Sequence, residues 1–318
     1  MRKLHFLAAC AALLLATGIP VGAQEKVGAA EPSVNLVNRQ YDFQQFTVVT
    51  LSHAFQVELC QGESWQVAVQ VPDYLEEYLR VRCADQILAI GLDRVPVKLQ
   101  PRIAEDREQM KVWITLPALH RLEVSEAVKV HSEGVFNVGA DPFSIQLSGA
   151  AKVSGLRVAG TRKCEVECSG AASLSADFGG DFSSGEFNLS GAAKMKVTAS
   201  VRKLDIVGSG ASECSVDGTF DQGVIQLSGT AKAYVRTEEA QFHGNSVDIH
   251  ASGVAKAEVS FPVRQADVSL SGVSSCRIAV AESLAYELTG TSTCSYQEAG
   301  ENVSLRGNAS RGTQLKRL

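Results

Sequence analysis

The sequence lacks several features that would identify its class at once. After residue 23, no segment approaches the roughly 20 consecutive apolar residues that a membrane-spanning helix needs. No Cys-x-x-Cys is present, and the histidines have no spacing typical of metal ligands. Basic residues are not in excess, because 30 lysines and arginines face 35 acidic residues, a net charge of −5. These absences argue against a transmembrane span, a metal or other cofactor, and nucleic acid as a partner.

Residues 1–23 are typical of a secretory signal peptide. Two basic residues at the start precede an apolar stretch that extends to Ala16, and Val21-Gly22-Ala23 is a small-residue cleavage site. An alternative is lipidation of Cys10, although the apolar stretch continues beyond that cysteine. The sequence therefore predicts an exported protein.

Eight cysteines are present, and Cys10 would leave with the signal peptide. The remaining number is odd, so in an oxidising compartment at least one thiol has no intramolecular partner. A disulfide between Cys60 and Cys83 is conceivable, as is one between Cys276 and Cys294. Burial of these residues as small hydrophobes is the alternative.

The chain contains an internal repeat with the core sequence Leu-Ser-Gly-Ala-Ala. Its glycines recur every 17 to 24 residues, a period typical of one coil of a solenoid. A degenerate copy comes first and has Glu126 in place of glycine. The glycines stand at positions 149, 170, 191, 210, 229, 253, 272, 290 and 307.

Apolar and polar residues alternate in each copy with the same phase. In the copy at Gly149, the apolar positions are Ile145, Leu147 and Val153. Period-2 alternation that is repeated in phase is what stacked parallel strands require. We therefore predict an all-β fold, a right-handed parallel β-solenoid (β-helix), rather than a propeller or a sandwich. In this fold, one vertical pile should contain Leu147, Leu189, Leu227 and Leu270.

Four features of the sequence resemble a known family. These are Phe43-Gln44-Gln45-Phe46, Phe55-Gln56-Val57-Glu58-Leu59 with Gln61-Gly62, the run Val-Trp-Ile-Thr-Leu-Pro-Ala-Leu at 112–119, and the repeated Leu-Ser-Gly-Ala-Ala. From about Tyr41 onward the chain is similar to the autotransporter adhesin head GIN domain family of the Gram-negative envelope. The resemblance implies a β-solenoid fold and a surface or adhesive role, and it supplies no catalytic residues.

We therefore expect a signal peptide at 1–23, a linker at 24–40 and one GIN-like β-domain at 41–318. Within this domain, an irregular N-terminal β-region at 41–118 should cap the first coil of the solenoid repeats at 119–310. A cap is expected because a bare sheet edge would promote pairing with further strands.

Catalysis would need clustered carboxylates, or calcium ligands on neighbouring coils. The best candidates are two pairs of aspartates, Asp177 with Asp181 and Asp217 with Asp221. They fail this requirement, because the coil between the two pairs has Thr198 at the place of Asp177 and Asp217. We interpret these aspartates as turn residues.

Lysines recur three places after the glycine and can line up along an anionic glycan. Ser173 and Glu213 interrupt the file, so a solvated face with cross-strand charge pairing is the alternative. The serines before the glycines are interpreted as a hydrogen-bonded ladder. The candidate ligand-binding residues are Lys129, Lys152, Lys194, Lys232 and Lys256.

The sequence favours a non-catalytic envelope protein, located in the periplasm, at the outer membrane or on the cell surface. Its expected role is that of an adhesin or structural module with a glycan, host protein or envelope protein as its partner. The alternative is a carbohydrate-active enzyme, a polysaccharide lyase or hydrolase built on a β-helix.

Overall fold

The computed structural model describes residues 34–238 and 244–318. The predicted signal peptide, Cys10 and residues 24–33 of the predicted linker lie outside the described residues. Within the described ranges, no helix has both the length and the apolar character needed to cross a membrane.

Strands dominate the described chain, and the helical segments are short and lie in the N-terminal region. That region contains β1 (Leu36–Tyr41), β2 (Val48–Leu51), β3 (Gln56–Gln61), β4 (Gln66–Pro72), η1 (Asp73–Tyr78), β5 (Leu79–Ala84), β6 (Ile87–Leu92), η2 (Val97–Leu99), α1 (Gln100–Asp106), η3 (Arg107–Gln109) and β7 (Lys111–Leu116). The repeat region contains β8 (Arg121–Val124), β9 (Lys129–Glu133), β10 (Phe136–Asn137), β11 (Phe143–Leu147), β12 (Lys152–Ala159), β13 (Lys163–Cys168), β14 (Ser173–Leu189), β15 (Lys194–Gly208), β16 (Glu213–Asp217), β17 (Phe220–Leu227), β18 (Lys232–Arg236), β19 (Gly244–Ala251), β20 (Lys256–Leu270), β21 (Ser275–Leu288), β22 (Thr293–Glu298), β23 (Ser304–Ala309) and β24 (Gln314–Arg317).

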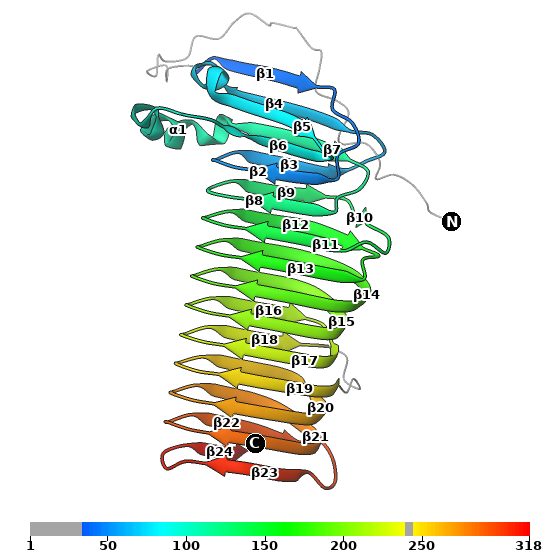
Figure 1. Ribbon diagram of the computed structural model, residues 1–318, viewed down its shortest axis with the longest axis vertical. Helices are drawn as coiled ribbons and strands as arrows, with labels where there is room; N and C mark the ends of the chain where they lie inside the picture. The colour runs from blue at the N-terminus through cyan, green and yellow to red at the C-terminus, as the bar shows by residue number, and fades with distance from the viewer. Residues whose placement is uncertain (1–33, 239–243) are drawn as a thin grey trace, which may run out of the picture. The chain divides into compact units, whose positions relative to one another are not determined.

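Each coil of the repeat region has one strand before the corner and one strand after it, which we call the leading and the trailing strand. In the coil of Gly149, these strands are β11 and β12. Leading strands pair in parallel with leading strands of the adjacent coils, as β11 does with β8 and β13. Trailing strands do the same, as β12 does with β9 and β14. The result is a leading sheet and a trailing sheet built from stacked coils (Figure 1), which confirms the predicted parallel β-solenoid.

The predicted apolar columns are vertical piles between the two sheets. Leu147 is in register with Cys168, which is in register with Leu189. The same file continues through Leu227 to Leu270. These side chains are at most 4% exposed, so the core extends along the stack and each coil contributes to it.

The corners explain why glycine recurs. Gly191 has φ +70°, and a Cβ atom added to it would lie 2.7 Å from the carbonyl oxygen of Gly170 in the next coil. The N–H group of Ala192 donates to this same oxygen at 2.7 Å. A side chain would therefore break the ladder that joins the corners. Glu126 occupies the corresponding corner with φ 60°, directly next to Gly149, so the degenerate copy keeps the geometry without the glycine.

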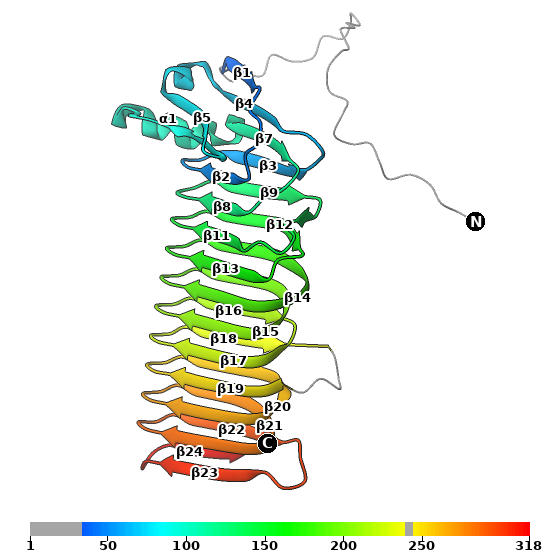
Figure 2. The ribbon, with the colours of Figure 1, turned by 45° about the vertical axis from the view of Figure 1, so that its right-hand side comes forward.

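The N-terminal region adds coils in an order that differs from the sequence. β2 pairs in parallel with β6 on one side and β8 on the other, and β3 lies likewise between β7 and β9. Strands β6 and β7 are thus the leading and trailing strands of an outer coil, with α1 in the segment that connects them. Antiparallel strands then cover this coil, β5 on β6 and β4 on β7, with β1 on β4 (Figure 2).

Two boundaries differ from those expected from the sequence. Strand β1 begins at Leu36, inside the predicted linker, because residues 36–41 pair with β4. Coil structure begins at β2, well before residue 119, because β2 and β3 already have parallel partners in the stack.

The last predicted copy of the repeat was placed wrongly at Gly307. This glycine lies inside β23, in register with Tyr286, and the last turn falls at 310–313. Leu305 consequently pairs with Leu284 and is 41% exposed. Leu305-Arg306-Gly307 has the same pattern as the Leu-Ser-Gly of the corners, and the pairing of β23 with β21 is what shows that it does not form a corner.

Candidate functional site

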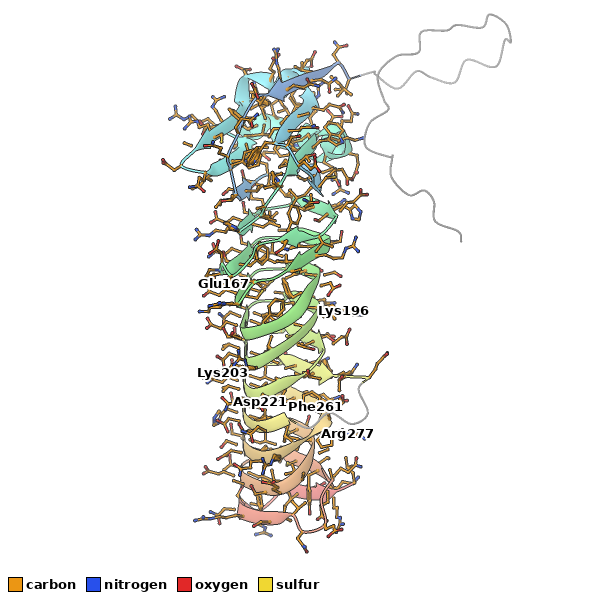
Figure 3. The ribbon with its side chains drawn as sticks, turned by 90° about the vertical axis from the view of Figure 1, so that its right-hand side faces the viewer. Glu167, Lys196, Lys203, Asp221, Phe261 and Arg277 are labelled. Atoms are coloured by element: carbon orange, nitrogen blue, oxygen red, sulfur yellow. The ribbon has the colours of Figure 1, made fainter. Side chains whose placement is uncertain are left out.

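The two sheets present outward faces of different charge. In Figure 3, Lys196 and Arg277 of the trailing sheet project on the side opposite Glu167 of the leading sheet. The outward cations of the trailing sheet outnumber its outward acids, which are Glu58, Glu133, Asp177, Glu213, Asp217 and Glu258. The cations are Lys111, Lys129, Lys152, Arg157, Lys194, Lys196, Lys232, Arg236, Lys256, Arg277 and Lys316. The outward acids of the leading sheet are Glu123, Glu165, Glu167, Glu186, Asp205, Asp248, Asp267 and Glu287.

The structure places all five predicted lysines in one file on the trailing sheet. Lys129 is in register with Lys152, and Lys232 with Lys256. Lys194 stands between these pairs, separated from them by the two interruptions noted in the sequence, Ser173 and Glu213. We call this set, with its interruptions, the lysine file.

The lysines of this file differ in how far they are neutralised. The Nζ atom of Lys129 lies 3.3 Å from Glu108 Oε1, and that of Lys256 lies 3.4 Å from Glu258 Oε2. In the part of the chain that the structure describes, Lys152, Lys194 and Lys232 have no carboxylate within ion-pair distance. These three ammonium groups are the ones available to an anionic ligand.

Sequence reasoning missed that the file continues into the N-terminal region. Lys111 of β7 is in register with Gln56 of β3, which is in register with Lys129. Lys111 lies outside the repeats, so the repeat pattern gave no signal for it. The strand pairing of β3 with both β7 and β9 brings it onto the same face.

The two neighbouring files on the trailing sheet are largely paired with each other. Lys196 Nζ lies 3.7 Å from Asp217 Oδ2, and Arg236 lies 3.8 Å from Glu258. The guanidinium carbon of Arg236 also stands 4.8 Å from the centre of the Tyr234 ring. These contacts are exposed and contribute little stability each, but they reduce the charge available to a ligand.

The leading sheet has a shallow groove beside the corners. Its two adjoining sections, of about 530 and 640 Å³, both contain Val207 and Ser209. The serines along it act as the predicted ladder. Ser169 Oγ donates to the carbonyl oxygen of Leu147 at 3.4 Å, and Ser252 Oγ to that of Leu227 at 3.5 Å.

Ser52, which follows the leading strand β2 as Ser125 follows β8, contacts a histidine. Its Oγ atom is 3.0 Å from Nδ1 of His53. This nitrogen also accepts the N–H group of Leu92 at 3.1 Å, so its lone pair is already used. His53 is therefore poorly suited to remove a proton from Ser52, and the pair acts in shaping the corner.

The aspartates considered for catalysis do not form one cluster. Asp177 is in register with Thr198, and Thr198 with Asp217, so a full coil separates the two aspartates. Asp221 follows on β17 of the leading sheet, and the side chain of Asp181 lies outside the described residues. Among the described residues, no group of three or more His, Cys, Asp and Glu side chains could hold a metal ion.

The seven described cysteines form no disulfide, and the five on the solenoid coils from Cys164 onward are buried. Cys60 and Cys83 lie on β3 and β5, which are not paired strands. Cys276 and Cys294 are in register on β21 and β22, both buried. A hydrogen bond between these two thiols lowers the pKa of Cys294 and, with burial, raises the pKa of Cys276.

These features define a parallel β-solenoid with a capped N-terminal end and a cationic outer face. A family model described as "Putative auto-transporter adhesin, head GIN domain" matches residues 45–278. The chain belongs to this family, which confirms the resemblance seen in the sequence.

Several solved structures are similar to the chain at low sequence identity. A putative adhesin from Bacteroides fragilis is 15% identical, with 90% of this chain and 99% of that chain covered and a TM-score of 0.39. A putative adhesin from Parabacteroides merdae is 15% identical, with 88% and 96% covered and a TM-score of 0.42. A putative lipid binding protein from Parabacteroides distasonis is 14% identical, with 89% and 97% covered and a TM-score of 0.45. No curated protein matches the chain.

Proposed function

We propose that the chain is a non-catalytic, exported binding module of the bacterial envelope, which holds an anionic glycan along the lysine file. The observation that supports this most directly is the file itself, with Lys152, Lys194 and Lys232 on one face and without ion-pair partners among the described residues. Membership of an adhesin family and the signal-like residues 1–23 support an exported, adhesive role.

The spacing of the file suits an extended polymer. Adjacent coils in a parallel sheet are about 4.8 Å apart. A linear glycan lying along the stack would therefore meet a cation or a hydroxyl group at nearly every coil, and Glu213 would be the one repulsive contact between Lys129 and Lys256. Such binding relies on many weak contacts and is screened by salt.

The non-catalytic part of the proposal is supported by the arrangement of the candidate aspartates. Asp177 and Asp217 are on alternate coils of the trailing sheet with Thr198 between them, and Lys196 already contacts Asp217. A glycosidase needs two carboxylates about 5–10 Å apart on either side of one bond. Two coil steps of about 4.8 Å put these two at the upper end of that range, with one of them already engaged by a lysine. Incubating the protein with polygalacturonate and with neutral glucans tests this. Release of reducing ends or of unsaturated uronates would contradict it.

Binding is tested with immobilised polygalacturonate, with dextran as the neutral comparison. We expect binding to polygalacturonate that weakens as salt rises, and about tenfold weaker binding when Lys152, Lys194 and Lys232 are all changed to Gln. The matched control changes three cations of the leading sheet, Lys203→Gln, Arg121→Gln and Arg306→Gln, which alters the net charge equally. Equal losses in both triple variants would reject the lysine file as the site.

Export is tested on intact cells. Protease shaving should release peptides of residues 34–318 if the chain is on the cell surface, and osmotic release without shaving would place it in the periplasm. Mass measurement of the mature N-terminus would distinguish cleavage after Ala23 from lipidation at Cys10. Retention in the cytoplasm would contradict the proposal.

A further inference from the structure

A pocket of about 390 Å³ lies at the N-terminal end of the trailing sheet, away from the repeats. Three side chains form its central row across the strands, because Gln40 of β1 is in register with Ala68 of β4, and Ala68 with Trp113 of β7. Gln66, Thr115 and Asp42 complete the polar part of the lining. Antiparallel pairing of β1, β4 and β7 is what brings these residues together.

Trp113 is the unusual member of this pocket. It lies between Val112 and Ile114, which are buried at 0% and 1% exposure, and it points outward with 40% of its surface exposed. Ala68 beside it has only a methyl group, so the neighbouring strand leaves that side of the indole ring uncovered. A large aromatic side chain on an exposed strand face contributes no core packing, and its apolar surface remains available to a ligand.

A second tryptophan, Trp65, helps to fix the pocket. Its indole N–H group donates to the carbonyl oxygen of Phe46 at 2.9 Å, and Tyr41 stacks on Phe43 with ring centres 5.4 Å apart. Both Trp65 and Tyr41 line the pocket. The aromatic wall is therefore held by contacts that exist before any ligand arrives, which reduces the entropy lost on binding.

We propose that this pocket binds a neutral sugar residue. A pyranose ring has one face of C–H groups, which suits the indole of Trp113, and a rim of hydroxyl groups, which suits two amides, a hydroxyl and a carboxylate. The lining contains Asp42 and no lysine or arginine, so it does not favour a uronate. The site is separate from the lysine file and does not depend on it.

Intrinsic fluorescence offers a direct test, because the protein has two tryptophans and both line the pocket. The probes are the methyl glycosides of glucose, galactose, mannose and N-acetylglucosamine, titrated into the full chain. We expect saturable changes with at least one glycoside and, as is common for single sugar units, dissociation constants on the order of 1 mM. The triple lysine-to-Gln variant should respond like the unchanged protein.

Two substitutions test the pocket in different ways. Ala68→Leu fills the space beside the ring while retaining both tryptophans, and it should abolish the response. Trp113→Ala should weaken glycoside binding, followed by calorimetry, about tenfold or more. Val254→Ser, at an exposed corner of the stack, is the matched control and should bind as before. Thermal unfolding of each variant verifies that the fold is retained.

The proposal is overturned if none of the four glycosides changes the fluorescence of the unchanged protein. It is also overturned if Ala68→Leu responds normally, because the sugar would then bind elsewhere. A saturable fluorescence change with a long-chain fatty acid, and with none of the glycosides, would assign the pocket to an acyl chain instead. Loss of polygalacturonate binding in the lysine variant has no bearing on these outcomes, so the two proposals can fail separately.

Discussion

The corner at Gly191 and the segment at 93–110 make the same connection, from a leading strand to a trailing strand, in different ways. At Gly191 the turn is tight, and it is joined to the next coil by a backbone hydrogen bond of 2.7 Å. At 93–110 the chain forms η2, α1 and η3, and side chains attach them. Tyr74 donates to Asp106 at 2.9 Å, and the guanidinium of Arg102 lies 3.9 Å from the Tyr74 ring centre.

The difference shows that stability has different sources in the two regions. In the stack, the same apolar positions and the same corner recur, so each coil is stabilised by contacts with its two neighbours. In the cap, the contacts are specific and occur once. We therefore expect substitutions in the stack to lower the global free energy of unfolding, and substitutions in the cap to act locally.

The largest effect should come from the buried piles. Phe187 is fully buried, in register with Val166 and Ile206, and Phe187→Ala should lower the free energy of unfolding by about 3–5 kcal/mol. Leu305→Ala, in the last coil where the side chain is 41% exposed, should cost less than about 1 kcal/mol. Urea denaturation measures both. Equal losses would mean that the ends of the stack are as well packed as its middle.

The corner should be the next most sensitive feature. Gly191→Ala combines a φ of +70° with a Cβ atom 2.7 Å from a carbonyl oxygen, and it should cost about 3 kcal/mol. Gly139→Ala is the matched control, because Gly139 has φ +64° but open space around its Cβ, so the backbone conformation alone should cost about 1–2 kcal/mol. The difference between the two variants measures the close approach of the coils.

Alkaline pH should act mainly on the stack. Burial raises the pKa of Cys168 from 9.0 to about 12, and burial also raises the pKa values of Cys164 and Cys214. Above pH 9 the unfolded chain loses these protons while the folded chain keeps them, so the unfolded state binds fewer protons and stability falls as pH rises. We expect a loss of about 2 kcal/mol between pH 8.5 and 9.5.

Denaturation of a triple Cys→Ala variant at 164, 168 and 214 is the control for this effect. The variant is expected to be less stable at neutral pH because of small cavities, but its stability should change little between pH 8.5 and 9.5. A pH dependence as steep as that of the unchanged protein would assign the effect to other groups.

The smallest effect is expected in the cap. Tyr74→Phe removes the hydroxyl group that donates to the buried Asp106, and it should cost about 1 kcal/mol. Hydrogen exchange should become faster in α1, while the stack from β11 onward remains protected. Tyr286→Phe, on the leading part of β21, serves as the comparison within the stack and should leave exchange in α1 unchanged.

The repeat region was predictable because one pattern occurs many times. Ile145, Leu147 and Val153 each lie in a pile that the alternation alone identified. The lysine file followed from the same alignment, since residues at equal positions in successive coils must be neighbours. Within the repeats, the prediction went wrong where the pattern degenerates, at Gly307, since a Leu-x-Gly step inside a strand looks like one at a corner.

The cap and its pocket were not predictable in the same way. The sequence predicted an irregular β-region at 41–118, but the order of its coils depends on which strands pair. No alternation indicates that β2 pairs with both β6 and β8. Trp113 carried a signal, an aromatic residue at an outward position between Val112 and Ile114. The alanine that exposes its ring comes from another strand through antiparallel pairing.

The uniform corner also determines how such a chain can change its length. The N–H group of Ala192 donates to the carbonyl oxygen of Gly170 at 2.7 Å, and that of Ala211 donates to Gly191 at the same distance. Removal of residues 191–209 would therefore stack Gly210 on Gly170 with every pile still aligned, and duplication of the same segment would add one coil. The length of the stack can thus change in steps of one coil, about 4.8 Å each. Its reach can be shortened or extended by recombination without redesigning a core.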